Sequence, residues 1–558
     1  MSRNHVRTRA AMTAGALAAL LLLAGCVDIP TGGSVTKLTI DSTGGDSALL
    51  TLPEAPTKGA SQEEILDGFI RAGRVPQVNY QVAREYLTDD FRTTWNPNAG
   101  VLVSSSPITP AAVSPNELQL AVQTSATIDA DGRYTTTADV QTKFLQYSFQ
   151  KDSKGQWRIS AAPDGTVLTP NRFAAIFQAY DLYFFDPSFN YLVPDRRWFA
   201  DSTQVATRIV KGLLAGPSPW LAGGVVVSAF PSGTELTGTP VIDSARATVD
   251  LSSQVSSESA TAKRRMTQQL TQSLSGLGTA SASITVGGFP VSVTGGPEPD
   301  LNLSVLQDPV GFEKGAFGTL VGGTVHPLPG IEAGIDKLAP VGAAVGRDSN
   351  EVAVLGGGGV SIVRGTTAPA LLDGRDGLAA PSLDPEGFVW SVPSGQPSAI
   401  VAYDAQAKAH PLALGVAGTI VSMAVSRDGT RLLVALQTSS GPQLLVAGII
   451  RDKDLIPTSF AQPYYVAVGP GELLSASWVN SGTVVALSQN GDTDSVTTYD
   501  LGGETQELGS VDSAVQVVGG NGTPGIRVLD SSGTVFSPSG TVGWQETGAK
   551  ASFLASQQ

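Results

Sequence analysis

The residue best suited to covalent chemistry in this 558-residue chain is Cys26, the one cysteine in the sequence. It follows Leu23-Ala24-Gly25, where two small residues let a peptidase approach the backbone at the Gly25–Cys26 bond. A thiol at this position is the nucleophile that diacylglyceryl transfer needs, because sulfur in its thiolate form is strongly nucleophilic. The spacing therefore predicts cleavage between Gly25 and Cys26 and lipidation of Cys26.

The residues before Cys26 support this prediction. Three arginines within the first nine residues form a positive segment, and an uncharged run over 10–23 follows. The run is long enough for the apolar part of a signal peptide but short for a membrane span. The whole segment resembles a bacterial lipobox, so residues 1–25 are predicted to be a lipoprotein signal peptide. The alternative is a buried free cysteine that follows an ordinary signal peptide or an anchor helix.

Charge and composition narrow the class of protein further. The formal net charge is −14, and an acidic chain without a basic stripe is a poor nucleic-acid binder, so we expect no nucleic-acid partner. Membrane attachment is assigned to acyl chains on Cys26, on the extracytoplasmic face of the cell membrane. Apolar residues make up 41% of the chain, and 63 glycines with 35 prolines favour short strands and tight turns.

The sequence offers little other chemistry. Of three histidines, His5 leaves with the signal peptide, while His326 and His410 each precede proline in expected turns. No His/Cys metal-binding pattern or recognised catalytic motif is present in the sequence. Residues 520–525 match G-x-G-x-x-G, but a strand pattern follows them, so they are interpreted as a hairpin loop. We predict no catalytic residues, no metal, no cofactor and no enzymatic activity.

The first half of the chain is predicted to contain a tether and a small α+β domain. Residues 26–60 are rich in Thr, Gly, Ser and Pro and indicate a flexible tether. Ser61 and Glu64 have the spacing of a capping box at the start of a helix, and a second helix is expected over 80–87. Alternating strands then continue to about residue 163, so residues 61–168 are predicted to be a cone-like α+β domain.

Two further segments follow. Residues 169–199 hold ten aromatic side chains. We interpret them as a connector whose helix and strands pack between domains, with a ligand or partner surface as the alternative. Residues 200–300 alternate helix and strand: a helix capped by Asp201 or Ser202, a strand and turn over 224–236, a helix over 262–277, and strands around a Gly287-Gly288 turn.

The remaining chain, residues 305–555, is predicted to be all-β. Asp- or Asn- and Gly-containing turns near residues 349, 385, 428, 481 and 531 lie between apolar strands, and no helix is expected here. Their spacing of roughly 36 to 53 residues is that of four-stranded propeller blades. We predict a β-propeller of five or six blades, with a β-sandwich as the alternative.

Several short motifs in order over about 200–295, among them "GLLAGPSPWL", "ATVDLSS" and "ITVGGFPVSV", resemble the GerMN domain. With the lipobox, the cone-like domain, the propeller and the opening "CVDIPTGG", the whole chain resembles the actinobacterial lipoprotein LpqB family. That resemblance implies a multidomain protein that binds the extracytoplasmic domain of a membrane sensor histidine kinase of the MtrA–MtrB type. It also implies effects on envelope homeostasis and cell division, and it transfers no catalytic residues.

Two alternative functions stay open at this point. One is a sensor that binds cell-wall glycan or lipid in the cone pocket or the propeller channel. The other is a wall-remodelling enzyme that uses ordinary carboxylates such as Asp89 and Asp90. Cell-wall components are thus possible further partners.

Overall fold

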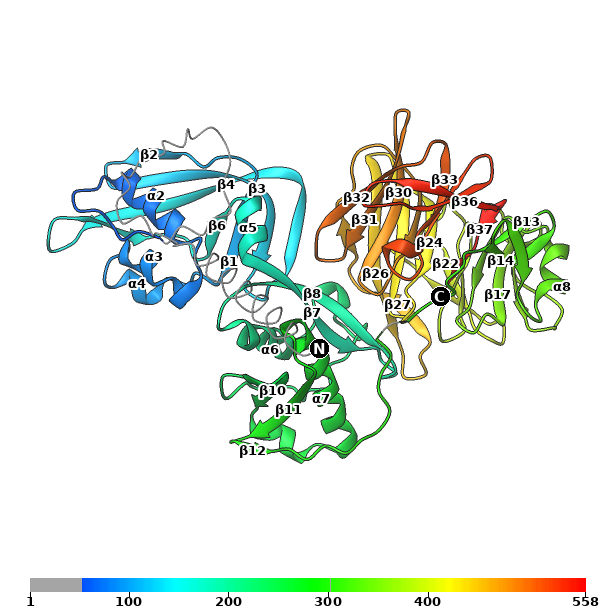
Figure 1. The fold of residues 1–558 in the computed structure, drawn as a ribbon, viewed down its shortest axis with the longest axis horizontal. Helices are drawn as coiled ribbons and strands as arrows, with labels where there is room; N and C mark the ends of the chain where they lie inside the picture. Colours follow the sequence, from blue (N-terminus) through cyan, green and yellow to red (C-terminus); the bar gives the residue numbers. More distant parts are fainter. Residues whose placement is uncertain (1–52, 302, 558) are drawn as a thin grey trace, which may run out of the picture. The chain divides into compact units, whose positions relative to one another are not determined.

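The computed structural model describes residues 53–301 and 303–557, drawn in colour in Figure 1. Gly25, Cys26, the predicted signal peptide and most of the predicted tether lie outside the described residues. No helix in the described ranges is long and apolar enough to cross a membrane. The described ranges comprise the folded regions that come after the tether in the sequence.

The first region begins with the predicted capped helix, α2 (Gln62–Ala72). Ser61 Oγ accepts from the Glu64 amide at 3.2 Å and the Glu64 carboxylate accepts from the Ser61 amide at 2.7 Å, which confirms the capping box. The predicted second helix is shorter than expected. The chain forms η1 (Gln77–Tyr80) and α3 (Gln81–Glu85), because Tyr80 takes a left-handed backbone conformation with a φ of 58°.

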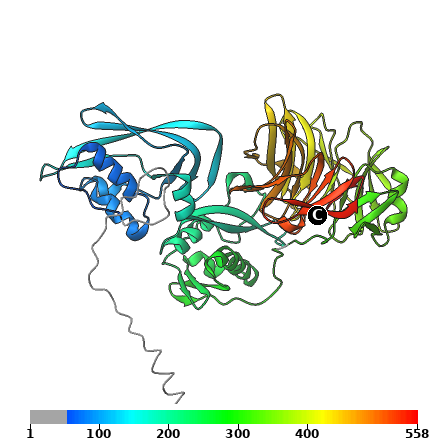
Figure 2. The ribbon, with the colours of Figure 1, turned by 45° about the horizontal axis from the view of Figure 1, so that its top comes forward.

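A curved sheet covers these helices, with strand order β5-β4-β3-β1-β6 and β2 paired to β3. One face of it packs on α2 and α3 through a shared apolar cluster (Figure 2). The sheet extends beyond the expected end near residue 163, because β6 pairs in parallel with β1. The elements are α4 (Phe91–Thr94), β1 (Gly100–Ser104), β2 (Pro110–Ser114), β3 (Glu117–Asp129), β4 (Tyr134–Lys151), β5 (Trp157–Ala161) and β6 (Thr166–Leu168).

The aromatic segment forms a helix and a hairpin: α5 (Pro170–Ile176), β7 (Phe177–Phe185) and β8 (Leu192–Ala200). At one end Phe173 and Trp198 pack on the cone-like region, beside Val101 of β1. At the other end Leu182 and Phe184 belong to the core of the second α+β region. The interpretation as packed helix and strands is confirmed, but the hairpin shares its core with that second region and is not a separate connector.

The second α+β region is built around a parallel strand pair, β10 and β11, joined through α7. Its helix α7 buries Met266, Leu270 and Leu274, as the periodicity predicts. Its elements are α6 (Val205–Ala215), η2 (Pro219–Leu221), β9 (Val241–Asp243), β10 (Arg246–Asp250), η3 (Ser253–Ser257), α7 (Ala260–Leu274), η4 (Ser275–Leu277), β11 (Ser281–Val286) and β12 (Phe289–Pro290). Gly287 and Gly288 both have positive φ in the predicted turn.

Two predictions for this region are wrong. The N-cap of α6 is Gln204, which makes no side-chain hydrogen bond to the helix, rather than Asp201 or Ser202. The segment over 224–236 forms no strand; its Val227 makes only an isolated bridge to Phe185. The apolar residues of this segment are instead buried in the core of the region as irregular chain. A short run of buried apolar residues has the same composition whether or not it forms a strand, which is why the prediction failed.

The all-β region forms six sheets, which makes a six-bladed propeller. The innermost strands contact one another in a closed ring in the order β37, β16, β20, β24, β29, β33 and β37 again. Strand β37, near the C-terminal end of the described chain, pairs with β13 and so completes the first blade (Figure 1). The strand after it, β38, pairs in parallel with β16 of the next blade, so the end of the propeller is joined to both blades at its beginning.

The propeller strands are β13 (Val310–Glu313), β14 (Ala316–Val321), β15 (Thr324–Pro327), β16 (Gly342–Val345), β17 (Glu351–Gly356), β18 (Gly359–Arg364), β19 (Ala370–Asp373), β20 (Ser382–Leu383), β21 (Val389–Ser391), β22 (Ile400–Tyr403), β23 (Ala409–Leu412), β24 (Thr419–Val425), β25 (Arg431–Thr438), β26 (Gly441–Arg451), β27 (Pro457–Phe460), β28 (Tyr464–Val466), β29 (Glu472–Trp478), β30 (Thr483–Asn490), β31 (Thr493–Asp500), β32 (Thr505–Ser510), β33 (Ala514–Val518), β34 (Arg527–Asp530), β35 (Thr534–Pro538), β36 (Trp544–Lys550), β37 (Phe553–Leu554) and β38 (Ser556–Gln557). The prediction of no helix is wrong at two places in the described propeller: α8 (Glu332–Ile335) and η5 (Asp336–Leu338) join two blades, and the short η6 (Thr523–Gly525) lies between β33 and β34. At α8, Ile331 and Ile335 are buried against the blades.

Candidate functional site

The sequence-predicted histidines do not lie in turns. His326 is in β15 and His410 is in β23, each the outermost strand of its blade. A following proline is tolerated there because an edge strand can leave one amide position unpaired. His410 Nε2 lies 3.0 Å from Asp404 Oδ2. Within the described residues no group of three or more His, Cys, Asp or Glu side chains could hold a metal ion.

The G-x-G-x-x-G match is confirmed as a connection between neighbouring strands. Residues 520–525 join β33 to β34, which pair antiparallel, and they include only the short η6 (Thr523–Gly525). No eight-residue helix begins there to receive a phosphate. The residues that the fold does bring together lie around the hairpin β7–β8 instead.

Side chains on β8 connect the hairpin to the propeller. Arg196 Nε donates to Asp181 Oδ1 at 2.9 Å on the neighbouring strand, and the same guanidinium forms an ion pair with Asp500 of β31. Trp198 Nε1 donates to the carbonyl of Gly502 at 2.8 Å. Arg196 and Asp500 are 304 positions apart in the sequence. Their ion pair and the Trp198 hydrogen bond hold the blade formed by β29, β30, β31 and β32 against the hairpin.

Arg197, fully buried beside them, connects the hairpin to the cone-like region and to α6. Its guanidinium donates to Asp195 Oδ2 at 2.6 Å, to the carbonyl of Asp131 at 3.1 Å and to that of Gly216 at 3.2 Å. Asp195 also accepts from the amide and the hydroxyl of Ser218, each at 2.7 Å. Both terminal nitrogens of Arg197 are thus bonded, and its charge is compensated by Asp195, whereas its buried Nε has no hydrogen-bond partner among the described residues.

The loop between β7 and β8 reaches the propeller at a second place. Asp186 accepts from the amides of Ser188 at 2.7 Å and Tyr191 at 2.6 Å and from the Ser188 hydroxyl. Arg347 of the propeller donates to Tyr191 Oη at 3.0 Å and to Asp300 at 2.7 Å. Burial raises the pKa of Asp186 above its usual range, although these hydrogen bonds oppose the shift.

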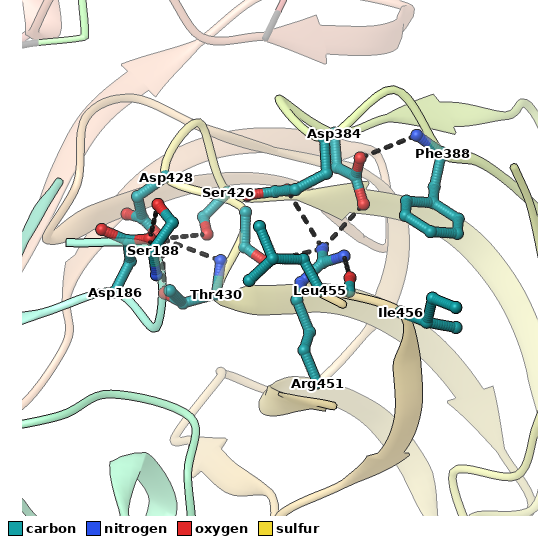
Figure 3. Close-up of polar contacts among 12 residues, drawn as sticks. Asp186, Ser188, Asp384, Phe388, Ser426, Asp428, Thr430, Arg451, Leu455 and Ile456 are labelled. Carbon is teal, nitrogen blue, oxygen red and sulfur yellow. Dashed lines mark hydrogen bonds and ion pairs between the residues drawn. The ribbon is translucent and has the colours of Figure 1, made fainter. Parts of the chain in front are cut away.

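Two buried arginines in the propeller each pair with a buried aspartate, and Figure 3 shows one of them, Arg451, with Asp384 and with the turn that carries Asp428. The first, Arg431, is paired with Asp428 and lies over the Trp478 ring, 5.0 Å from its centroid. Asp428 also accepts from the Ser426 hydroxyl at 2.8 Å and from the Thr430 amide at 3.0 Å. The turn from β24 to β25 is therefore fixed by its own side chains.

The second buried arginine, Arg451 at the end of β26, joins two blades. It donates to Asp384 Oδ2 at 2.7 Å and to the carbonyl of Gly429 at 2.9 Å, and its guanidinium lies 3.3 Å from Glu386 Oε2. Asp384 also accepts from the Phe388 amide and from the indole of Trp390. Arg451 therefore ties the turn after β20 to the turn after β24 (Figure 3).

Glu386 has the most unusual electrostatics of this cluster. Burial raises the pKa of Glu386 to about 8, against the attraction of Arg451 and with further upward shifts from Asp384 and Asp186. Asp384, Glu386 and Asp186 also act on Arg451. Burial lowers the pKa of the Arg451 guanidinium, but the attraction of the acids, mainly Asp384 and Glu386, outweighs burial and raises this pKa. Near neutral pH the Glu386 carboxyl is thus largely protonated, and Asp384 is the main counter-charge of Arg451.

We call the hairpin β7–β8, with its loop and the Arg451 cluster, the hairpin junction. Its charged groups form ion pairs with one another and hydrogen bonds with backbone atoms, which is typical of groups that stabilise a structure. Among its described side chains no nucleophile lies beside a base. Hydrogen bonds and ion pairs of the junction thus join side chains of the hairpin to the cone-like region and to the propeller.

Sequence reasoning missed Asp384, Glu386 and Arg451. The motifs "SLDPEG" and "SRDGTR" were recognised only as turns between strands. One signal is present in the sequence: in each motif charged residues lie in a short turn directly between apolar strands, and charged side chains so close to a core are seldom buried unless paired. The partner of each charge lies in another blade or region, so the pairing itself was not readable.

Comparisons with known proteins agree with this architecture. A family model described as the N-terminal domain of lipoprotein LpqB matches residues 55–174, and one described as the LpqB beta-propeller domain matches residues 315–552. A model described as sporulation and spore germination, named Germane, matches residues 181–292. The Germane match begins within the hairpin, in agreement with the shared core.

Related chains carry the same name. "Lipoprotein LpqB" of Bifidobacterium longum is 27% identical over 485 residues, covering 81% of this chain and 80% of that protein. "Lipoprotein LpqB" of Cutibacterium acnes is 29% identical over 294 residues, so the alignment spans about half of each, 52% and 49%. A solved structure of tandem GerMN domains of GerM from Bacillus subtilis is 20% identical, covers 22% of this chain and 44% of that one, and has a TM-score of 0.18.

The fold and the junction define a multidomain protein in which a GerMN-type domain is joined to a C-terminal β-propeller. The two models specific to LpqB match the two ends of the described chain and together cover more than half of the sequence. The chain belongs to the LpqB lipoprotein family. None of the three matching models describes an enzyme.

Proposed function

We propose that this protein is a lipid-anchored accessory protein of the cell envelope that binds the extracytoplasmic domain of a sensor histidine kinase. The kinase is of the MtrA–MtrB type, and binding modulates its signalling in envelope homeostasis and cell division. The lipid on Cys26 attaches the protein to the extracytoplasmic face of the membrane. Membership of the LpqB family is the observation that carries the proposal.

The geometry of the hairpin junction supports a binding role. A partner that contacts two regions at once binds more tightly when bonds between those regions restrict their relative motion, because less freedom is then lost on binding. Arg196, Trp198 and Arg197 make part-buried hydrogen bonds across region boundaries, and such bonds restrict that motion. The described side chains of the junction form no nucleophile–base arrangement, and catalysis is not part of the proposal.

Photo-crosslinking in intact cells tests this proposal. Probes are introduced singly at three exposed apolar positions: Phe144 of β4, Val241 of β9 and Tyr465 of β28, which are 64%, 61% and 54% exposed. Crosslinks from one or more positions to the extracytoplasmic domain of a sensor kinase are expected, and the position identifies the region that binds it. Crosslinks confined to wall enzymes or transporters would contradict direct binding of the kinase.

A matched control separates binding from membrane placement. The same probes are placed in a chain that carries Cys26→Ser, which removes the predicted acceptor of the lipid. Loss of the crosslinks in this chain, with recovery when a membrane-spanning helix replaces the lipid signal, would show that proximity to the membrane is what the lipid supplies.

A further inference from the structure

The cone-like region contains a cavity that the hairpin junction does not use. Its volume is about 370 Å³, and it lies between α2 and the curved sheet. The wall is mainly apolar and includes Phe69, Trp95, Leu102 and Leu145. Small-molecule sites are typically clefts of about 300–1,000 Å³ with apolar walls and few polar groups, whereas packed cores leave few voids larger than a water molecule.

One polar group in the wall of this cavity lacks a partner. Tyr147 is 3% exposed, and among the described residues none makes a hydrogen bond with its hydroxyl. Its ring is held edge-on against Phe69, with ring centroids 6.3 Å apart. By contrast, the hydroxyl of Tyr86 in the same core donates to the carbonyl of Glu54 at 2.8 Å. The Tyr147 hydroxyl is not among the fully buried unpartnered atoms of the described chain, so it is accessible from the cavity and is a donor available to a molecule there.

The charge at this cavity is provided by Lys143. Residues 143, 145 and 147 of β4 alternate onto the sheet face that carries the core, opposite Val122, Leu120 and Leu118 of β3. Lys143 is exposed and lines the cavity, and in the described part of the chain no carboxylate forms an ion pair with it.

The acids in the cavity wall have other bonds. Asp129 accepts from the amides of Asp131 and Arg133 and is paired with the Arg133 guanidinium at 3.1 Å. Asp164 accepts from the amide of Asn96 at 2.8 Å. The polar groups of the wall that no described residue binds are therefore the Lys143 ammonium and the hydroxyls of Tyr147, Thr127 and Thr166, and a cation with hydroxyl donors suits an anionic group with acceptor oxygens.

We propose that this cavity binds a single-chain anionic amphiphile, with its apolar chain among Phe69, Trp95 and Leu102 and its head bound by Tyr147 and Lys143. The shared chemistry is an apolar chain with an anionic oxygen head, which a fatty acid or a lipid phosphate supplies. Such a site adds ligand binding to the proposed kinase binding and does not depend on it. It gives an envelope protein a means of responding to lipids.

Isothermal titration calorimetry tests the site with three probes of equal chain length: dodecanoate, dodecyl phosphate and dodecanol. The protein is the chain from residue 26 onward with Cys26→Ser, so that no lipid of its own competes. We expect saturable binding of one anionic probe per chain, and dodecanol about tenfold or more weaker because it has no charge for Lys143. If only dodecanoate binds, the ligand class is a fatty acid, and if only dodecyl phosphate binds, it is a lipid phosphate. If both bind, the site recognises the negative charge of the head group in either form.

Variants locate the binding. Tyr147→Phe keeps the ring and removes only the hydroxyl, so about tenfold weaker binding is expected with a melting temperature that does not fall, because the hydroxyl has no protein partner to lose. Lys143→Gln should weaken binding and reduce its salt dependence, whereas Lys154→Gln, on an exposed turn away from the cavity, should bind as the wild type does.

Thr127→Phe tests occupancy, because Thr127 lines the cavity and a ring at this position fills it. Abolished binding in a folded Thr127→Phe protein supports the site. If this variant does not fold, the Tyr147→Phe comparison decides. Failure of both anionic probes to bind, or undiminished binding in Tyr147→Phe and Lys143→Gln, would overturn the proposal.

Discussion

Replacing Arg451 with methionine tests whether the charged cluster holds the propeller together. Methionine keeps most of the length and apolar volume of the side chain but removes the guanidinium. Asp384, whose side chain is fully buried, then loses its counter-charge and a 2.7 Å hydrogen bond. The carbonyl of Gly429 loses its 2.9 Å donor as well.

The expected loss of stability follows from these contacts. Removal of one partner from a buried ion pair costs about 3–5 kcal/mol because the other charge stays buried without compensation. Asp384 keeps its bonds to the Phe388 amide and the Trp390 indole, and Glu386 is largely protonated near neutral pH, so we expect about 3 kcal/mol. For a domain of this size, that loss corresponds to about 6–12 °C in melting temperature.

Calorimetry and urea unfolding monitored by tryptophan fluorescence measure the effect at pH 7. Lys453→Met is the matched control, since Lys453 is 87% exposed and its ion pair with Asp454 is on the surface, so its stability should change by less than about 1 kcal/mol. The double variant Arg451→Met/Asp384→Asn should recover part of the loss, because no uncompensated charge then remains. An Arg451→Met protein as stable as the Lys453→Met control would refute the reasoning.

Four further predictions concern single side chains. Glu386→Gln should remove a pH dependence: the folded-state pKa of about 8 lies above the unfolded value, so wild-type stability should fall by up to about 1.4 kcal/mol per pH unit as the pH rises from about 5 to 8, and the variant should show a flatter profile in urea unfolding. Trp198→Phe removes the indole donor to Gly502, and hydrogen exchange should report faster exchange in the hairpin, by about tenfold for a loss near 1.4 kcal/mol. Ser61→Ala should destabilise the cone-like region by about 1 kcal/mol in urea unfolding through loss of the cap, with Ser153→Ala on an exposed turn as the unaffected control. Cys26→Ser should abolish acylation and release the protein from the membrane fraction, and a serine variant that is still acylated and sedimented with membranes would contradict the lipobox.

Local interactions explain which features could be predicted from the sequence. The capping box at Ser61 and Glu64, the buried face of Met266 and Leu270 in α7, and the Gly287-Gly288 turn all depend on neighbours a few positions apart. The propeller was also predictable, because each blade repeats the same pattern of apolar strand and polar turn. Where a prediction failed, a distant contact decided the outcome. The segment over 224–236 has a strand composition, yet its apolar residues are buried as irregular chain in the core of the Germane domain.

The candidate sites divide in the same way. Cys26 and its small neighbours form a signal that a peptidase reads from extended chain, so this prediction needed no fold, and it stays a prediction because the described residues begin after it. The positions of Arg451, Asp384 and Glu386 relative to one another could not be read from the sequence, since 67 residues separate the first two.

The sequence by itself determined the capping box at Ser61, the tight turns, the repeat that makes a propeller and the family to which the chain belongs, because each is encoded in motifs of residues that are close together in the chain. Only the tertiary structure decided that β37, from the far end of the chain, completes the first blade, that Arg196 meets Asp500, and that Tyr147 is left without a partner at a cavity. The physical reason is that packing and charge pairing depend on distances in space, and these distances exist only once the sheets have closed.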